Sequence, residues 1–165
     1  MTILGLDPGT ATTGFGVIEE LGGRLALRAV GVIRTPTTLS APSRLKAIYD
    51  ETNQLLDCYS PDVVATERLF FSKNEVTALS VGRTIGVILL AVANRGLPWH
   101  EYTPLQVKQA ATGIGSAHKK QVQFMVARLL GLQEAPKPDD AADALAVAIC
   151  HAHSAKLMDQ GVRNR

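Results

Sequence analysis

The stretch Thr2-Ile-Leu-Gly-Leu-Asp7 opens the chain as an apolar run that ends on an acid, and the turn signal Asp7-Pro-Gly-Thr10 follows at once. A short apolar run bounded by proline and glycine predicts a buried β-strand, here with Asp7 at its end. Gly14–Glu20 and Arg24–Arg34 have the strand pattern too, and Gly22-Gly23 separates them. We therefore expect the first three strands to form a meander.

Beyond residue 34 the apolar spacing alternates between the helical and the strand period. The expected elements are a helix over Ser40–Tyr59, a strand over Asp62–Glu67, a helix over about 73–93, a strand over Leu97–Tyr102, short helices beginning at Thr103-Pro104 and capped by Ser116, and a last helix from Asp139 to about Leu157. This order predicts an α/β fold with a five-stranded mixed sheet flanked by helices. We expect a single domain over residues 1–157 and a disordered tail over residues 158–165.

The composition is that of a water-soluble globular protein, with 46% hydrophobic and 19% charged residues. The first apolar stretch is broken by Asp7, so we expect no signal peptide, and the longest uncharged apolar run, Val87–Ala93, is too short to span a bilayer. Cys58 and Cys150 lie outside any C-x-x-C pattern, and we expect them to be buried free thiols. These features favour a cytoplasmic protein without membrane contact.

Positive charge is concentrated in the middle of the chain. The whole chain has a net charge of +2, yet no acid occurs between Tyr102 and Gln133, where four lysines and arginines lie. A one-sided basic segment is typical of a protein that binds a polyanion such as DNA. The alternative is a solvated face that acids elsewhere balance in space.

Four acids lie at the boundaries of apolar elements. Asp7 ends the first strand, Glu67 ends the fourth, and Asp140 and Asp143 lie three residues apart on one face of the last helix. Carboxylates that converge at one point repel each other unless cations neutralise them, and oxygen-only ligands favour Mg²⁺ or Mn²⁺. Two such ions about 4 Å apart can activate water and stabilise a leaving oxygen at phosphorus.

Each acid also has a structural explanation. Asp7 can open a turn, Glu67 can be a surface acid, and an aspartate in the first turn can cap a helix. Asp139 adds a further alternative, because Asp139 and Asp143 lie four apart and can form the ligand pair in place of Asp140 and Asp143. A shared cation site is the simplest single reason for all four acids.

The chain resembles the RuvC family of Holliday-junction resolvases along most of its length. The matching motifs are Ile3-Leu-Gly-Leu-Asp-Pro-Gly-Thr10 with Thr13-Gly-Phe-Gly-Val17, Ala65-Thr-Glu-Arg-Leu-Phe70 with Lys73-Asn74, Gln106-Val-Lys-Gln109 with Gly113-Ile-Gly-Ser-Ala117, and Asp140-Ala-Ala-Asp-Ala-Leu-Ala146. The resemblance implies a ribonuclease-H-like fold and a metal-dependent crossover junction endodeoxyribonuclease. Its metal-binding catalytic residues are then Asp7, Glu67, Asp140 and Asp143, with two Mg²⁺ ions, or Mn²⁺ in their place.

The resemblance also implies DNA contacts and partners. Lys108 and Lys119 match lysines near the cut strand, and Phe70 matches an aromatic that stacks on an unpaired base, although Phe70 can instead pack at the start of the next helix. With Lys73 and Lys120 these residues form the expected DNA-binding set. The expected partners are a four-way DNA junction, a second copy of the chain, and a branch-migration motor of the RuvA–RuvB type.

Three rival functions share parts of this pattern. Asp7-x-Gly-Thr10 resembles the phosphate loop of actin-like ATPases, but those enzymes need two such domains. A non-catalytic DNA-binding module would explain the basic segment but not the four acids, which repel phosphate. The third rival is a nuclease of the same fold that cuts another substrate, such as an RNA–DNA hybrid; the resemblance over Gln106–Lys119 and at Phe70 favours the resolvase over it.

The helix expected over 73–93 is apolar on more than one side. Gly82 and Gly86 lie four residues apart on it, with Ala78, Ile85 and Leu89 on nearby rows. Small residues at this spacing allow two helices to approach closely. We expect part of this helix to pack on the protein's own sheet and the rest to form a two-fold homodimer contact.

Overall fold

The computed structural model describes residues 1–68 and 75–163, with side chains described for residues 1–68 and 78–155. Within these ranges the elements are β1 (Thr2–Asp7), β2 (Thr12–Leu21), β3 (Arg24–Arg34), α1 (Ala41–Tyr59), β4 (Val63–Glu67), α2 (Glu75–Asn94), β5 (Trp99–Tyr102), α3 (Pro104–Thr112), α4 (Lys119–Leu129) and α5 (Asp139–Arg163). Among the described helices, none has the length and apolar character needed to cross a bilayer.

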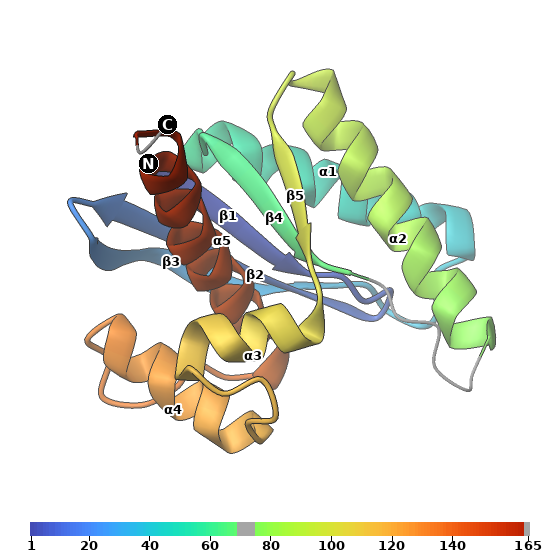
Figure 1. Cartoon of the computed structure of the whole chain (residues 1–165). Helices are drawn as coiled ribbons and strands as arrows, with labels where there is room; N and C mark the ends of the chain where they lie inside the picture. Colours follow the sequence, from blue (N-terminus) through green and yellow to red (C-terminus); the bar gives the residue numbers. More distant parts are fainter. Residues whose placement is uncertain (69–74, 164–165) are drawn as a thin grey trace.

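The five strands form one mixed sheet in the order β3-β2-β1-β4-β5 (Figure 1). β1, β2 and β3 are antiparallel neighbours, which confirms the meander, and β4 and β5 run parallel to β1. The Gly22-Gly23 turn joins β2 to β3 with positive φ angles of 59° and 88°, which glycine adopts at little cost. α1 and α2 are the crossover connections that parallel strands require.

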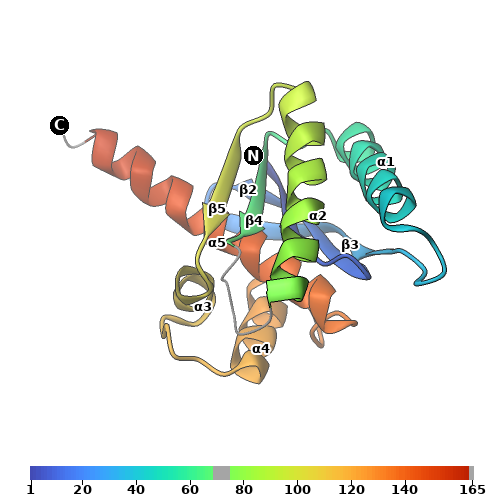
Figure 2. The same ribbon diagram turned by 90° about the vertical axis from the view of Figure 1, so that its right-hand side faces the viewer.

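Helices cover both faces of the sheet, and the core has a layer on each side (Figure 2). On one face α5, with α3 and α4 beside it, packs on Ile3, Ile18 and Ala65. On the other face Ile88 and Val92 of α2, with α1, pack on large side chains of β1, β2 and β4. The expected five-stranded mixed sheet flanked by helices is therefore confirmed.

Several expected boundaries are wrong by a few residues. β5 begins at Trp99 and not at Leu97. α4 begins after His118 and not after Ser116, because the His118 backbone N–H bonds to the Gln121 side chain at 2.8 Å and closes the first turn. α5 continues past the expected end at residue 157, to Arg163. The division into a domain of residues 1–157 and a disordered tail stays a prediction.

The expectation that both cysteines are buried is wrong for one of them. Cys150 on α5 is buried and Cys58 on α1 is exposed, and both are free thiols. The buried side of α1 is formed by Ile48, Thr52 and Leu56, each four residues from the next. Cys58 lies two residues beyond Leu56, about 200° around the helix, and therefore faces solvent.

Candidate active site

Three strand glycines allow α5 to lie directly on β1 and β2. A Cβ atom on Gly14 would overlap the carbonyl oxygen of Asp140, and one on Gly5 would overlap backbone atoms further along α5. A Cβ atom on Gly16 would lie 2.6 Å from the Leu145 side chain. Gly14 pairs with Asp7 across the hairpin, so the first turn of α5 lies directly over the end of β1.

Strand alternation directs two carboxylates to the α5 face of the sheet. In β1, Ile3 and Gly5 face α5, so Asp7 does too, since side chains two apart share a face. In β4, Ala65 faces α5, and Glu67 follows at the same spacing. Because β1 and β4 are parallel and adjacent, both strands end at the same edge of the sheet.

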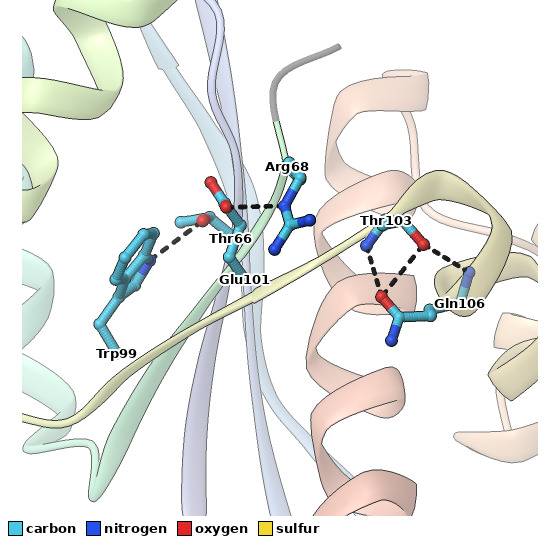
Figure 3. Close-up of polar contacts among 6 residues, drawn as sticks. All are labelled: Thr66, Arg68, Trp99, Glu101, Thr103 and Gln106. Carbon is cyan, nitrogen blue, oxygen red and sulfur yellow. Dashed lines mark hydrogen bonds and ion pairs between the residues drawn. The ribbon is translucent and has the colours of Figure 1, made fainter.

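Side-chain contacts hold the end of β4 in place (Figure 3). Arg68 forms an ion pair with Glu101 of β5 at 3.0 Å, and the Trp99 indole N–H donates to the Thr66 hydroxyl at 3.0 Å. Both contacts join β4 to β5 on either side of Glu67. They fix the backbone that carries this carboxylate.

A capping box begins the helix that carries Lys108. The Thr103 hydroxyl accepts from the Gln106 backbone N–H at 3.2 Å, and the Gln106 side-chain oxygen accepts from the Thr103 backbone N–H at 2.8 Å (Figure 3). Pro104 occupies the first turn, as its spacing predicts. The cap directs α3 away from the end of β5, so Lys108 comes to lie beside Glu67.

The charged side chains surround a set of adjoining hollows. A cavity of about 330 Å³ is lined by Glu67, Lys108, Lys119 and Asp143, with apolar side chains of α3, α4 and α5 as its floor. Glu67 also lines a neighbouring hollow with Asp7. Charged residues from five elements, β1, β4, α3, α4 and α5, therefore meet at one edge of the sheet.

Burial and neighbouring acids raise the pKa values of the two strand-end carboxyls. The pKa of Asp7 rises to about 7, first because burial disfavours its charged form and then because Asp143, Glu67 and Asp140 lie nearby. Burial and the charge of Asp143 also raise the pKa of Glu67, whereas Lys108 and Lys119 oppose this rise. Asp7 is therefore coupled electrostatically to each of the other three acids.

Lys119 interacts with two acids of α5 at once. Its ammonium lies 2.9 Å from Asp143 and 3.2 Å from Asp139. Asp139 also accepts a hydrogen bond from the Gln123 amide at 2.9 Å, and these two partners lower the pKa of Asp139. Asp140 lies instead beside the turn after β1, near Gly9. The Asp140 backbone lies against Gly14, the strand partner of Asp7, so the geometry favours Asp140 over Asp139 as the neighbour of Asp7.

The donor set suits a hard divalent cation. All four converging groups are carboxylates, and neutralisation by a cation would relieve the repulsion that raises the pKa of Asp7. Among the described residues, no three Asp, Glu, His or Cys side chains lie close enough together to form a preformed metal site. Asp143 is paired with Lys119 in this arrangement, so metal binding requires that pair to separate.

The expected DNA-binding residues lie in different places in the structure, and two of them lie outside the described residues. Lys108 and Lys119 line the cavity beside the acids. Lys120, the next residue along α4, lines a separate hollow together with Phe124. Phe70 and Lys73 lie outside the described residues, so their roles stay predictions.

Two groups of residues were not found from the sequence. The Asp139–Gln123 pair joins the start of α5 to α4. In addition, the Thr10 hydroxyl lies 2.7 Å from the Ser80 hydroxyl and 3.1 Å from that of Thr84, which ties the turn after β1 to α2. Two hydroxyl residues at one-turn spacing on an apolar helix, Ser80 and Thr84, were the available signal for the second group.

A mixed sheet of this order, with acids at two adjacent strand ends and at the start of a helix packed across them, defines a nuclease of the ribonuclease-H-like class. Residues 3–151 match the family described as crossover junction endodeoxyribonuclease RuvC. The chain belongs to this family. The family is metal-dependent.

Relatives of the same description match almost the whole chain. The crossover junction endodeoxyribonuclease RuvC of Syntrophomonas wolfei is 55% identical over 95% of this chain and 91% of its own length. That of Heliobacterium modesticaldum is 57% identical over 93% of this chain and 95% of its own. The expected family is therefore confirmed.

Solved structures confirm the ribonuclease-H-like fold. Thermus thermophilus RuvC matches with a TM-score of 0.88, and the same protein in complex with a Holliday junction matches with 0.91. Both are 38% identical and cover 95% of this chain and 96% of theirs. The yeast mitochondrial Holliday junction resolvase, 15% identical with a TM-score of 0.68, shares the fold.

Proposed function

We propose that this chain resolves four-way DNA junctions by paired symmetric nicks in recombination and repair, with Asp7, Glu67, Asp140 and Asp143 as its catalytic, metal-binding residues. The observation that carries the proposal is the packing of the start of α5 on Gly14 and Gly5, next to the adjacent ends of β1 and β4, and it supports a common site for the four carboxylates. Membership in the RuvC family and the likeness to a RuvC bound to a junction support the substrate.

The residues divide the work of phosphodiester hydrolysis. Asp7, Glu67, Asp140 and Asp143 would hold two Mg²⁺ ions, or Mn²⁺, whose positive charge would serve to activate a water molecule and to stabilise the leaving oxygen. The four carboxylates hold this charge at the sheet edge, and the glycine contacts beneath α5 keep Asp140 at a fixed distance from β1. Lys108 and Lys119, at the cavity wall, neutralise the phosphate that enters.

DNA binding extends beyond the cavity in this proposal. Lys120 contacts phosphate on the neighbouring face of α4, and Lys73 and Phe70 contact the strand near the junction centre. Replacement of Lys108 or Lys119 by Gln should reduce the slope of log affinity against log salt by about one unit for each phosphate that the lysine neutralises. Affinity titrations at several salt concentrations would measure it, and an unchanged slope would contradict the phosphate contacts.

Incubation of a synthetic four-way junction with Mg²⁺, Mn²⁺ or EDTA, followed by strand mapping, tests the activity. We expect symmetric nicks with ligatable ends that EDTA abolishes. Asp7→Asn or Asp140→Asn should reduce cutting by several orders of magnitude while junction binding survives, because an amide keeps the shape but loses the charge that holds the cation. Glu51→Gln on the exposed side of α1 is the matched control. Cleavage of an RNA–DNA hybrid in preference to the junction would favour the rival nuclease.

The proposed assembly is a two-fold homodimer through α2. Ala78 and Ile85 are buried against the protein's own fold, whereas Leu79 and Leu90 are 59% and 53% exposed. Gly86 lies on the exposed side with no other atom near its Cβ position, so a second helix can approach closely there. A two-fold pair presents two active sites to the equivalent strands of a junction.

Sedimentation equilibrium tests this assembly. The wild type should give about twice its 17.6 kDa mass at micromolar concentration. Gly86→Glu should shift it toward the monomer and remove paired nicks, because two like charges would face each other at the contact. Gln133→Glu, at an exposed position between α4 and α5 on the other face of the sheet, is the matched control. A wild-type monomer that makes both nicks in one encounter would contradict the model.

The cellular setting follows from the same proposal. We place the protein in the cytoplasm, where two free cysteines stay reduced. A branch-migration motor of the RuvA–RuvB type is its expected partner on the junction. Co-sedimentation of the protein with a motor-bound junction, compared with the bare junction, would test this partnership.

A further inference from the structure

Lys119 is shared between two aspartates that differ in their surroundings. Asp139 and Asp143 lie four residues apart on α5, one turn of helix, so both reach the same ammonium group. The Asp143 side chain is 28% exposed and lines the cavity, whereas that of Asp139 is 62% exposed and lies at the rim. Lys119 therefore bridges the inside of the site and its edge.

Asp139 is itself fixed from α4. The Gln123 amide, one turn after Lys119 on the same helix, donates to one Asp139 carboxylate oxygen at 2.9 Å, and Lys119 binds the other. Both oxygens of Asp139 are thus used by α4. Asp143 has no such second partner from α4 among the hydrogen bonds of the described residues.

We propose that Asp139 is a positioning residue that holds Lys119 at the rim of the cavity when Asp143 binds a divalent cation. The proposal rests on the proposed function, in which Asp143 is a metal ligand. A cation at Asp143 repels the Lys119 ammonium, and Asp139 offers that ammonium a second carboxylate one helical turn away. Lys119 then stays beside Lys108 and Glu67, where the phosphate enters.

Without Asp139, Lys119 has only one carboxylate partner. It should then remain on Asp143 and compete with the cation, so the Asp139→Asn variant should bind metal more weakly. Removal of any negative charge also weakens cation binding, and this general effect must be separated from the specific one. The separation is possible because the specific effect acts only through Lys119, whereas the general effect does not need it.

A double-mutant cycle on Mn²⁺ binding, measured calorimetrically on the full chain without DNA, tests the proposal. Lys119→Gln should tighten Mn²⁺ binding about threefold, the size expected for release of a partly exposed ion pair. Asp139→Asn should weaken it about threefold in the wild-type background, and by less than about 1.5-fold in the Lys119→Gln background. Asp139→Glu should restore wild-type affinity, and Arg128→Gln, which removes a charge further along α4, should change little.

Single-turnover cleavage gives the second readout. Asp139→Asn should lower the cleavage rate at saturating metal while junction affinity in Ca²⁺ stays the same, because Lys119 is displaced but still present. An Asp139→Asn effect of equal size in both backgrounds would overturn the proposal, since Asp139 would then act only as a negative charge. Unchanged Mn²⁺ binding by Asp143→Asn would instead contradict the metal site itself.

Discussion

α5 and α2 lie on opposite faces of the same sheet, and glycine has opposite effects at the two contacts. Under α5, Gly5 and Gly14 remove side chains so that the helix backbone rests on the strands. On α2, Gly86 faces open space. The α2 contact with the sheet depends on large side chains instead, among them Ile88 and Val92. A backbone contact holds a helix at a distance that side-chain rotation cannot alter, whereas side-chain packing tolerates adjustment.

The two kinds of contact correspond to different proposed roles for the two helices. The helix that rests on glycine carries Asp140 and Asp143, which belong with Asp7 to the proposed metal site. The helix packed through side chains has an outer face with exposed leucines and an uncovered glycine, suited to a partner. The comparison predicts that small substitutions strongly lower the free energy of unfolding at the α5 contact and have little effect on it on the outer face of α2.

Alanine at two glycines gives the largest expected contrast. Gly14→Ala should lower the free energy of unfolding by more than about 3 kcal/mol, because its Cβ atom overlaps the Asp140 backbone. Gly86→Ala should leave stability unchanged or raise it by up to about 1 kcal/mol, because alanine favours the helix. Urea unfolding of both variants measures the contrast, and equal losses would contradict the distinction between the two helices.

Neutralisation of Asp7 tests whether the packing of α5 brings the acids together at the expense of the stability of the folded protein. Since burial and neighbouring acids raise the folded-state pKa of Asp7 to about 7, its contribution to stability is present below the ordinary value of 3.8 and lost as the pH rises through about 7. Asp7→Asn should therefore raise the melting temperature of the metal-free protein at pH 8 by about 5 °C, and by less at pH 5. Thermal unfolding in EDTA measures it, and an equal gain at both pH values would contradict the raised pKa.

A smaller pH effect on stability is expected from His151, which lies further along α5. Burial, and then the nearby His100, lower the His151 pKa to about 4, and its Nδ1 atom lies 2.8 Å from the Tyr102 hydroxyl. The folded protein resists protonation there, so stability should fall as the pH drops from 6.5 toward 4. His151→Gln should flatten this fall by about 1 kcal/mol in urea titrations, whereas His118→Gln on the surface should not. A parallel pH profile for both variants would refute the assignment.

Much of the fold was predictable because its signals are local. Asp7 and Glu67 each end an apolar strand, and period-two alternation then places both on one face. The choice between Asp139 and Asp140 was not predictable in the same way, since both lie in the first turn of α5. The rotation of that helix is set by its contact with Gly14, which lies far earlier in the chain.

The sequence also could not predict that Lys119 and Lys120 line different hollows. Adjacent residues on a helix diverge by about 100°, so one lines the acid cavity and the other lines a different hollow. Which lysine points inward depends on how α4 packs against α5. No local pattern in an acid-free segment encodes that long-range contact.

The two cysteines have a practical consequence for measuring the assembly. Cys58 is exposed at the end of α1, and Cys150 is buried at 1% exposure, so a maleimide spin label should react at one thiol per chain. In a two-fold pair, one label per chain gives a single interspin distance. Pulsed electron paramagnetic resonance on the unmutated protein can therefore follow the pair as it forms, with and without a DNA junction.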